Sequence, residues 1–101
     1  MPYITASRRA HLEPAIAQLK AALTTAGDRN IVPGGDNKME PGDLNYAITR
    51  LSMAFLENRG TLNYHSLALI TGVLENVKQE LYRRAAAPYE DRKIADNGDV
   101  Y

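Results

Sequence analysis

The stretch LNYHSLALITGVLENVKQELYRRAAAPYEDRKI, residues 62–94, decides the fold of this chain. Its large aliphatic residues recur at steps of three and four, which predicts one long amphipathic helix with a single packing face. Asn63 suits the N-cap of that helix. Pro88 is expected to kink or stop it, because proline lacks the N–H and its ring clashes with the preceding turn. The packing face comprises Leu67, Ile70, Leu74, Val77 and Leu81.

A second helix is expected upstream, in EPGDLNYAITRLSMAFLENRG, residues 40–60. Glu40 fits the cap position, Pro41 the first helical position and Asp43 the positive end of the helix dipole. Gly60 ends the helix, and the short link to Leu62 predicts an antiparallel hairpin with the third helix. Its core stripe consists of Leu44, Ile48, Leu51 and Phe55.

The N-terminal part predicts a shorter helix. Thr5 or Ser7 can cap a helical turn over residues 7–12, after which Pro14 predicts a break at Glu13. The main helix then runs from Pro14 to about Thr25. Residues 27–40 are rich in glycine, proline, asparagine and aspartate, so they are expected to form a long loop.

The expected fold is therefore a single all-α domain over residues 1–101: a helical hairpin, a shorter N-terminal helix and a C-terminal extension. The tail, residues 96–101, is expected to be either a free end or an arm docked on a neighbour. Val100 and Tyr101 make docking more plausible than for most terminal tails. The helices cannot cover every apolar side chain, so the chain is expected to form a homo-oligomer. The surplus residues lie off the main stripes and include Met53, Leu56, Leu69 and Val73.

Composition narrows the function. Twelve basic and twelve acidic residues cancel, which argues against a nucleic-acid interface. The chain has no cysteine, and it shows no signal peptide and no membrane-spanning run of about 20 apolar residues. We therefore expect a cytoplasmic protein with neither nucleic acid nor membrane as a partner.

No pattern in the sequence predicts catalysis, a metal or a cofactor. The two histidines have no second ligand at helical spacing, and DNGD at residues 96–99 lacks the later acid of a calcium loop. No nucleophile motif or phosphate-binding loop is present. We expect a protein that is not an enzyme.

The most suggestive side chains for binding are tyrosines and cations near the end of the long helix. Arginine forks bind phosphate bidentately and tyrosine rings stack on bases, so the group could hold an anionic, nucleotide-like ligand. The alternative, which the spacing favours, is that the arginines pair with Glu80, Glu90 and Asp91 on a solvated face. The predicted site comprises Tyr46, Arg50, Tyr82, Arg83, Arg84, Tyr89, Arg92 and Lys93.

Two segments carry a family resemblance: PGDLNYAITRL at residues 41–51 and ELYRRAAAPYEDRKIADNGDVY at residues 80–101. They resemble a family of small uncharacterised proteins encoded in bacterial and bacteriophage genomes. The resemblance implies a phage or prophage accessory protein that acts by binding in the cytoplasm of a bacterial host cell. It brings no known activity and no functional residues.

These observations lead to two main hypotheses, beside a weaker third, an enzyme that uses Glu90 or Asp91. The first is a homo-oligomer that sequesters an anionic nucleotide-like signal molecule of host defence. The alternative is a protein-interaction module that binds and inhibits a host protein, for which a flat apolar patch with a polar rim is expected instead of a pocket.

Overall fold

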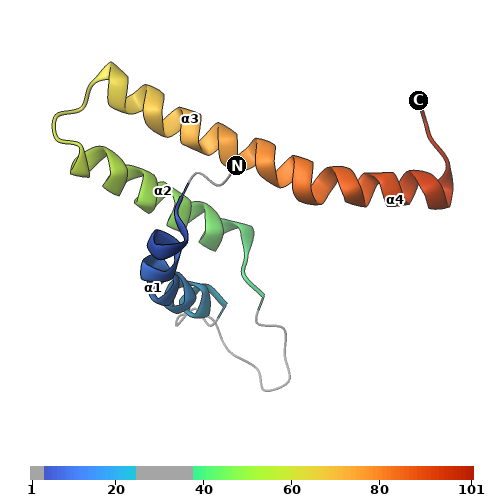
Figure 1. The fold of residues 1–101 in the computed structure, drawn as a ribbon, viewed down its shortest axis with the longest axis horizontal. Coiled ribbons are helices and arrows are strands. Elements are labelled where there is room, and N and C mark those ends of the chain that lie inside the picture. Colours follow the sequence, from blue (N-terminus) through green and yellow to red (C-terminus); the bar gives the residue numbers. More distant parts are fainter. Residues whose placement is uncertain (1–3, 25–37) are drawn as a thin grey trace. The chain divides into compact units, whose positions relative to one another are not determined.

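The structure is a computed structural model that describes residues 4–24 and 38–101. Throughout these residues the regular structure is helical, which confirms the all-α class. The chain forms two compact units, Met1–Arg50 and Leu51–Tyr101. The helices are drawn from blue to red in Figure 1. Most of the long loop predicted at residues 27–40 lies outside the described residues.

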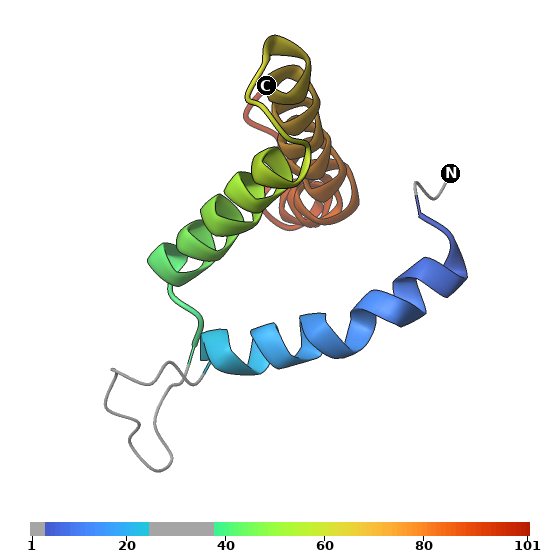
Figure 2. The same cartoon turned by 90° about the vertical axis from the view of Figure 1, so that its left-hand side faces the viewer.

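The first helix, α1, runs from Ala6 to Thr24 without a break, and Figure 2 shows it as one ribbon. Thr5 caps it, because its Oγ1 accepts the N–H of Arg8 at 3.3 Å. The predicted break at Glu13 was wrong, as was the shorter length, since α1 has 19 residues. Six of these are alanine, the best helix former, and helical residues on both sides of Pro14 offset the one hydrogen bond that it cannot donate.

The second helix, α2, runs from Pro41 to Asn58 and begins as predicted. Pro41 occupies the first helical position, where a missing N–H costs nothing. Asp43 lies in the first turn, and its Oδ2 accepts the backbone N–H of Glu40 at 3.3 Å. The carboxylate thus caps the N-terminus of α2 and also lies at the positive end of the helix dipole.

The chain reverses between α2 and α3 through a glycine and an asparagine. Gly60 has φ +92°, a left-handed conformation that glycine adopts without steric cost. Asn63 then caps α3, which runs from Tyr64 to Leu81. Its Oδ1 accepts the backbone N–H of Ser66 at 2.9 Å and the Ser66 hydroxyl at 3.2 Å. Both predicted roles are confirmed.

The helix does not stop at Pro88. After α3 comes η1, a π-helical turn from Tyr82 to Ala86, and then α4, from Ala87 to Asn97. The N–H of Ala87 reaches back five residues to the carbonyl of Tyr82. The turn thus contains one residue more than an α-helical turn and is wider. The extra width keeps the ring of Pro88 from clashing with the carbonyl of Arg84. The expected stop was therefore wrong, because α3, η1 and α4 follow one another as one rod. The rod changes direction between α3 and α4 (Figure 1), as the alternative expectation of a kink allowed.

Very little of the described chain is buried. Ile70, at 9% exposed, is the one buried apolar residue, and Ser66, at 2%, is the one buried polar residue. Both lie in the first two turns of α3. The rest of the predicted α3 stripe is open, with Val77 57% and Leu81 65% exposed.

Gly98, with φ +87°, ends α4, and its N–H donates to the carbonyl of Ile94 at 2.8 Å. Beyond it, Val100 and Tyr101 are almost fully exposed. The Oδ1 of Asp99 accepts the N–H of Tyr101 at 2.9 Å. Docking of this tail on a neighbouring molecule stays a prediction.

Candidate functional site

Six of the eight predicted site residues lie on the continuous rod, within two successive segments. η1 carries Tyr82, Arg83 and Arg84, and α4 carries Tyr89, Arg92 and Lys93. From Tyr82 to Lys93 the rod spans about 16 Å at about 1.5 Å per residue. The structure divides this length into three sets of contacts.

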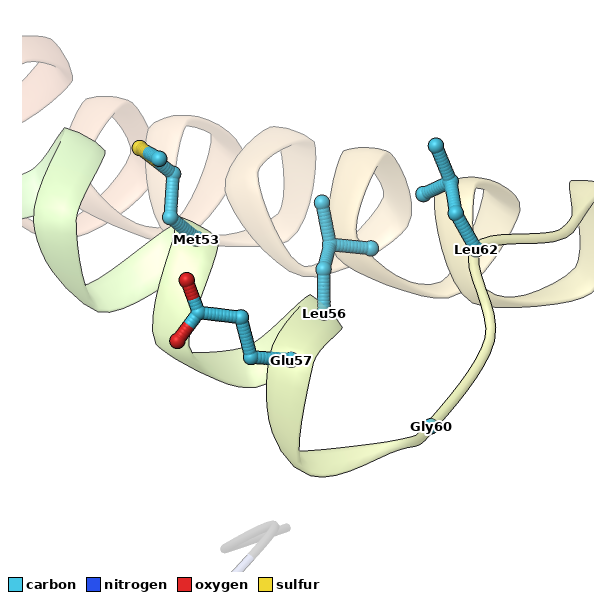
Figure 3. A pocket seen from close by; sticks show the side chains of 5 residues that line it. All are labelled: Met53, Leu56, Glu57, Gly60 and Leu62. Carbon is cyan, nitrogen blue, oxygen red and sulfur yellow. The ribbon is translucent and has the colours of Figure 1, made fainter.

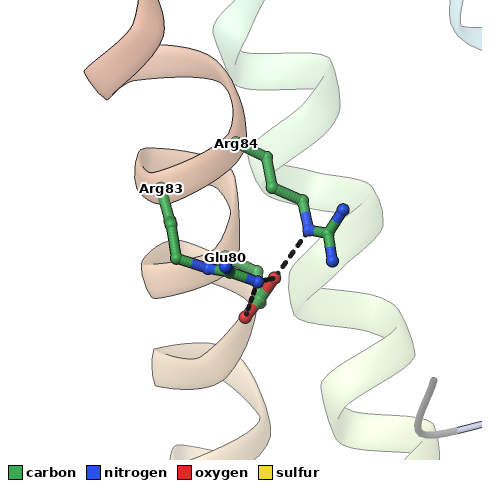
Figure 4. A network of polar contacts seen from close by, with 3 residues as sticks. All are labelled: Glu80, Arg83 and Arg84. Atoms are coloured by element: carbon green, nitrogen blue, oxygen red, sulfur yellow. Dashed lines mark hydrogen bonds and ion pairs between the residues drawn. The ribbon is translucent and has the colours of Figure 1, made fainter. Parts of the chain in front are cut away.

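The first set is centred on Glu80, in the last turn of α3 (Figure 4). Arg84 donates its Nε to Oε2 at 2.8 Å, and Arg83 donates its Nη2 to both carboxylate oxygens at 3.1 and 3.3 Å. The hydrogen bond from Arg84, followed by that from Arg83, lowers the pKa of Glu80 below its ordinary value of 4.5. The pairing expected on a solvated face is confirmed for these two arginines.

The second set joins η1 to α4. The hydroxyl of Tyr82 donates to Oε2 of Glu90 at 3.3 Å. Eight residues separate the two, so the contact bridges the π turn and holds both sides of it on one face. Spacing rules for a regular helix consider partners three or four residues apart and do not predict this contact.

The third set surrounds Tyr89. The guanidinium of Arg92 lies 5.9 Å and the Nζ of Lys93 5.5 Å from the centre of the tyrosine ring. At these distances both cations are attracted by the ring, by about 0.5–1 kcal/mol each at exposed sites. The ring and two cations together form a small positive surface.

The remaining two predicted residues, Tyr46 and Arg50, lie on α2 within the first unit. The guanidinium of Arg50 lies 6.0 Å from the ring centre of Tyr46. They form a fourth group, a tyrosine–cation pair one turn apart on the helix. The eight predicted residues therefore lie in separate local groups, six on the rod and two on α2.

These groups suit anion binding only in part. Arg83 and Arg84 are 66% and 71% exposed at their side chains, and both donate to Glu80. A phosphate would have to compete with that carboxylate. The surface of one helix is also convex, whereas small-molecule sites are concave, so a second surface has to supply the opposite wall.

The π turn has a further effect, on the apolar stripe. In a regular helix Tyr89 would lie about 80° around the axis from Leu81, at about 100° per residue. Because η1 holds one extra residue in its turn, the rotation between Leu81 and Tyr89 is about 100° smaller than in a regular helix. Tyr89 thereby returns to within about 20° of Leu81, so the stripe of α3 continues along α4.

An open hollow lies beside the turn between α2 and α3 (Figure 3). It has a volume of about 220 Å³ and an apolar lining apart from one glutamate. Met53 and Leu56 were expected to be surplus apolar residues, but the hollow was not predicted, because it exists only where the chain reverses. The lining residues are Met53, Leu56, Glu57, Gly60 and Leu62.

Two further observations concern residues 4–24 and 38–101. In these ranges no three histidine, cysteine or acidic side chains gather as a metal site would require. Among the described helices, none combines the length and the apolar character needed to cross a bilayer.

Fold and site together define an all-helical protein with a charged cluster and an apolar stripe on one long helix. Residues 1–100 match the family model described as domain of unknown function DUF6899. The chain belongs to this family, which confirms the predicted resemblance to an uncharacterised family. No curated protein and no solved structure matches the chain.

Proposed function

We propose that this protein acts by binding and not by catalysis, and that its working form is a homo-oligomer. The supporting observation is how little of the described chain is buried. Within the described ranges only Ile70 and Ser66 are buried, while the α3 stripe from Leu74 onward is exposed. Apolar stripes of this length are covered in stable proteins, because each aliphatic side chain gains about 1.5–3 kcal/mol on full burial.

The composition favours a second copy as the covering chain. The formal net charge is zero, and proteins without net charge lack the mutual repulsion that keeps molecules apart. In the assembly α2 and α3 pair as an antiparallel hairpin, and the stripe of the rod faces the copy. Closed symmetry then buries the same stripe in every copy.

The ligand we propose is an anionic, nucleotide-like molecule held by the tyrosines and cations of η1 and α4. Tyr89 with Arg92 and Lys93 supports this assignment, since a ring flanked by cations suits a base and its phosphate. Assembly supplies the opposing wall that a single convex helix lacks. Tyr46 and Arg50 are the proposed additional contacts.

The proposed setting is the cytoplasm of a bacterial cell, where the protein serves as a phage or prophage accessory factor that removes a signal molecule of host defence. Binding of a host protein through the same stripe is the competing outcome. The two differ in composition of the complex: sequestration gives a homo-oligomer with a small adduct, and inhibition gives a complex with a second polypeptide.

Native mass spectrometry of the protein purified from cells tests both parts. We expect a homo-oligomer that carries a nucleotide-sized adduct. A strictly monomeric species at micromolar concentration would exclude the assembly, and an oligomer without an adduct would be followed by calorimetric titration with cyclic and linear nucleotides.

The chain contains a matched control for that titration. Arg83→Ala/Arg84→Ala should weaken nucleotide affinity at least about tenfold, because charge-assisted hydrogen bonds to phosphate are lost. Arg8→Ala/Arg9→Ala removes the adjacent arginine pair in α1 and should leave the affinity unchanged. Equal effects of the two double variants would contradict the proposed site.

A further inference from the structure

We propose that two copies pair as an antiparallel dimer whose two-fold axis passes between Leu81 and Tyr82, and that Tyr101 of each copy seats in the hollow beside Leu62 of the other. This inference rests on the proposed self-association and specifies its interface. Three features of the second unit fit this alignment.

The first feature is the position of the exposed stripe. After Ile70, which is buried, the stripe is open from Leu74 to Tyr89, and the π turn keeps Tyr89 on it. In an antiparallel pair, opposite residue numbers have a constant sum. The midpoint of Leu74 and Tyr89 falls between residues 81 and 82, so an axis there covers the part of the open stripe that lies beyond Ile70.

The second feature is the tail and its distance from its own hollow. α3, η1 and α4 contain 18, 5 and 11 residues, so the rod of 34 residues is about 50 Å long. The four residues after Asn97 reach at most about 14 Å when extended. The tail therefore cannot fold back to the hollow of its own chain, and only another copy can provide Tyr101.

In the proposed alignment the tail can reach the hollow of the copy. The register places Asn97, where α4 ends, opposite Ser66 of the copy, close to the start of α3 at Tyr64. The four residues beyond Asn97 span at most about 14 Å, which is enough to bring Tyr101 to the level of Leu62. A dry apolar cavity of about 150 Å³ is enough for a benzene ring, and the hollow measures about 220 Å³. It can hold the ring of Tyr101, which is fully exposed in the single chain.

The third feature is charge complementarity at the axis. In this register Glu80 lies opposite residue 83 of the copy, about 1.5 Å along the axis from the copy's Arg84. Glu80 and Arg84 lie on the same flank of the stripe, as their 2.8 Å hydrogen bond shows. In an antiparallel pair, the same flank of each helix faces the other copy. Glu80 of one copy therefore lies on the side of Arg84 of the other. Arg84 bonds Glu80 of its own chain through Nε, and its other N–H groups can bond Glu80 of the copy.

The natural absence of cysteine makes the register directly measurable. Thr61→Cys and Val100→Cys place one thiol beside each of Leu62 and Tyr101 and leave both side chains intact. The two single variants are mixed, oxidised mildly and separated without reductant. We expect a mixed disulfide between position 61 of one chain and position 100 of the other. Mixing Thr61→Cys with Asn76→Cys, on the far face of α3, should give none.

Sedimentation equilibrium on the unmodified protein separates the possible failures. A dimer that forms the mixed 61–100 disulfide supports the proposal. A dimer that instead gives 61–61 and 100–100 disulfides pairs in parallel, which overturns the register and leaves the proposed self-association standing. A monomer at tens of micromolar overturns both.

Discussion

Two lengths of the same rod differ in what covers them. The first two turns of α3 hold both buried residues, Ser66 and Ile70, next to the cap made by Asn63. From Leu74 to Tyr89 the same stripe is exposed. Burial within the chain is thus confined to Ser66 and Ile70, since Leu67 between them is 41% exposed, and the remainder of the stripe requires a partner. Substitutions at the two ends should therefore change different quantities, namely unfolding free energy at the first and association at the second.

The largest effect is expected for Leu81→Asp, at the proposed axis. Each dimer would contain two carboxylates in apolar surroundings, and burial of an unpaired charge is costly. The dissociation constant from sedimentation equilibrium should rise at least about 100-fold, while circular dichroism of the monomer stays unchanged. Asn76→Asp lies about 140° around the helix from Leu81 and should change neither quantity. Equal effects of the two substitutions would remove the distinction between the two faces.

Ile70→Ala tests the other end of the comparison. The loss of a buried side chain should lower the unfolding free energy by about 2 kcal/mol, the low end for such substitutions because the surrounding core is small. Urea denaturation at a concentration that keeps the chain monomeric gives this value. Val77→Ala deletes a similar side chain that is 57% exposed, so it should cost less than about 0.5 kcal/mol in the same measurement and weaken association instead. The comparison fails if the two substitutions affect unfolding equally.

Pro88→Ala should affect association through geometry alone. Alanine restores the missing N–H, so a regular α-helix can replace the π turn and rotate α4 by about 100° relative to α3. Tyr89 then leaves the stripe, and the dissociation constant should rise about tenfold although helix content by circular dichroism is unchanged or higher. Pro14→Ala, in α1, is the matched control and should leave association as it is. Unchanged association after Pro88→Ala, with backbone chemical shifts showing a regular helix, would contradict the rotation argument.

What the sequence predicts correctly in this chain is local. The start at Pro41, the end near Gly60 and the Asn63 cap depend on a few neighbouring residues, and all three are confirmed. The break at Glu13 and the stop at Pro88 do not occur, because proline as a helix terminator is a preference that long flanking helices override.

The contacts of the candidate site likewise divide into one that local spacing predicts and others that it does not. Pairing of Arg83 and Arg84 with Glu80 follows from spacing. The contact between Tyr82 and Glu90 depends on the inserted π residue, and the hollow beside Leu62 depends on chain reversal. Neither follows from spacing along a regular helix.

The smallest effect concerns pH at the junction of α3 and η1. Hydrogen bonds from Arg84 and Arg83 lower the pKa of Glu80 in the folded chain. A group with a lowered folded pKa stabilises the structure above its unfolded value and loses that contribution as pH falls through the folded value. Acidification from pH 7 to below the ordinary glutamate value of 4.5 should therefore weaken the junction. Because the carboxylate is exposed, the effect on unfolding should be small.

In the dimer the same carboxylate also faces Arg84 of the copy, so Glu80→Gln should reduce the pH dependence of association more than that of unfolding. Glu75→Gln, one turn away and paired with Lys78 at 3.9 Å, is the control: if it reduced the pH dependence of association equally, the charge pairing at the axis would be wrong.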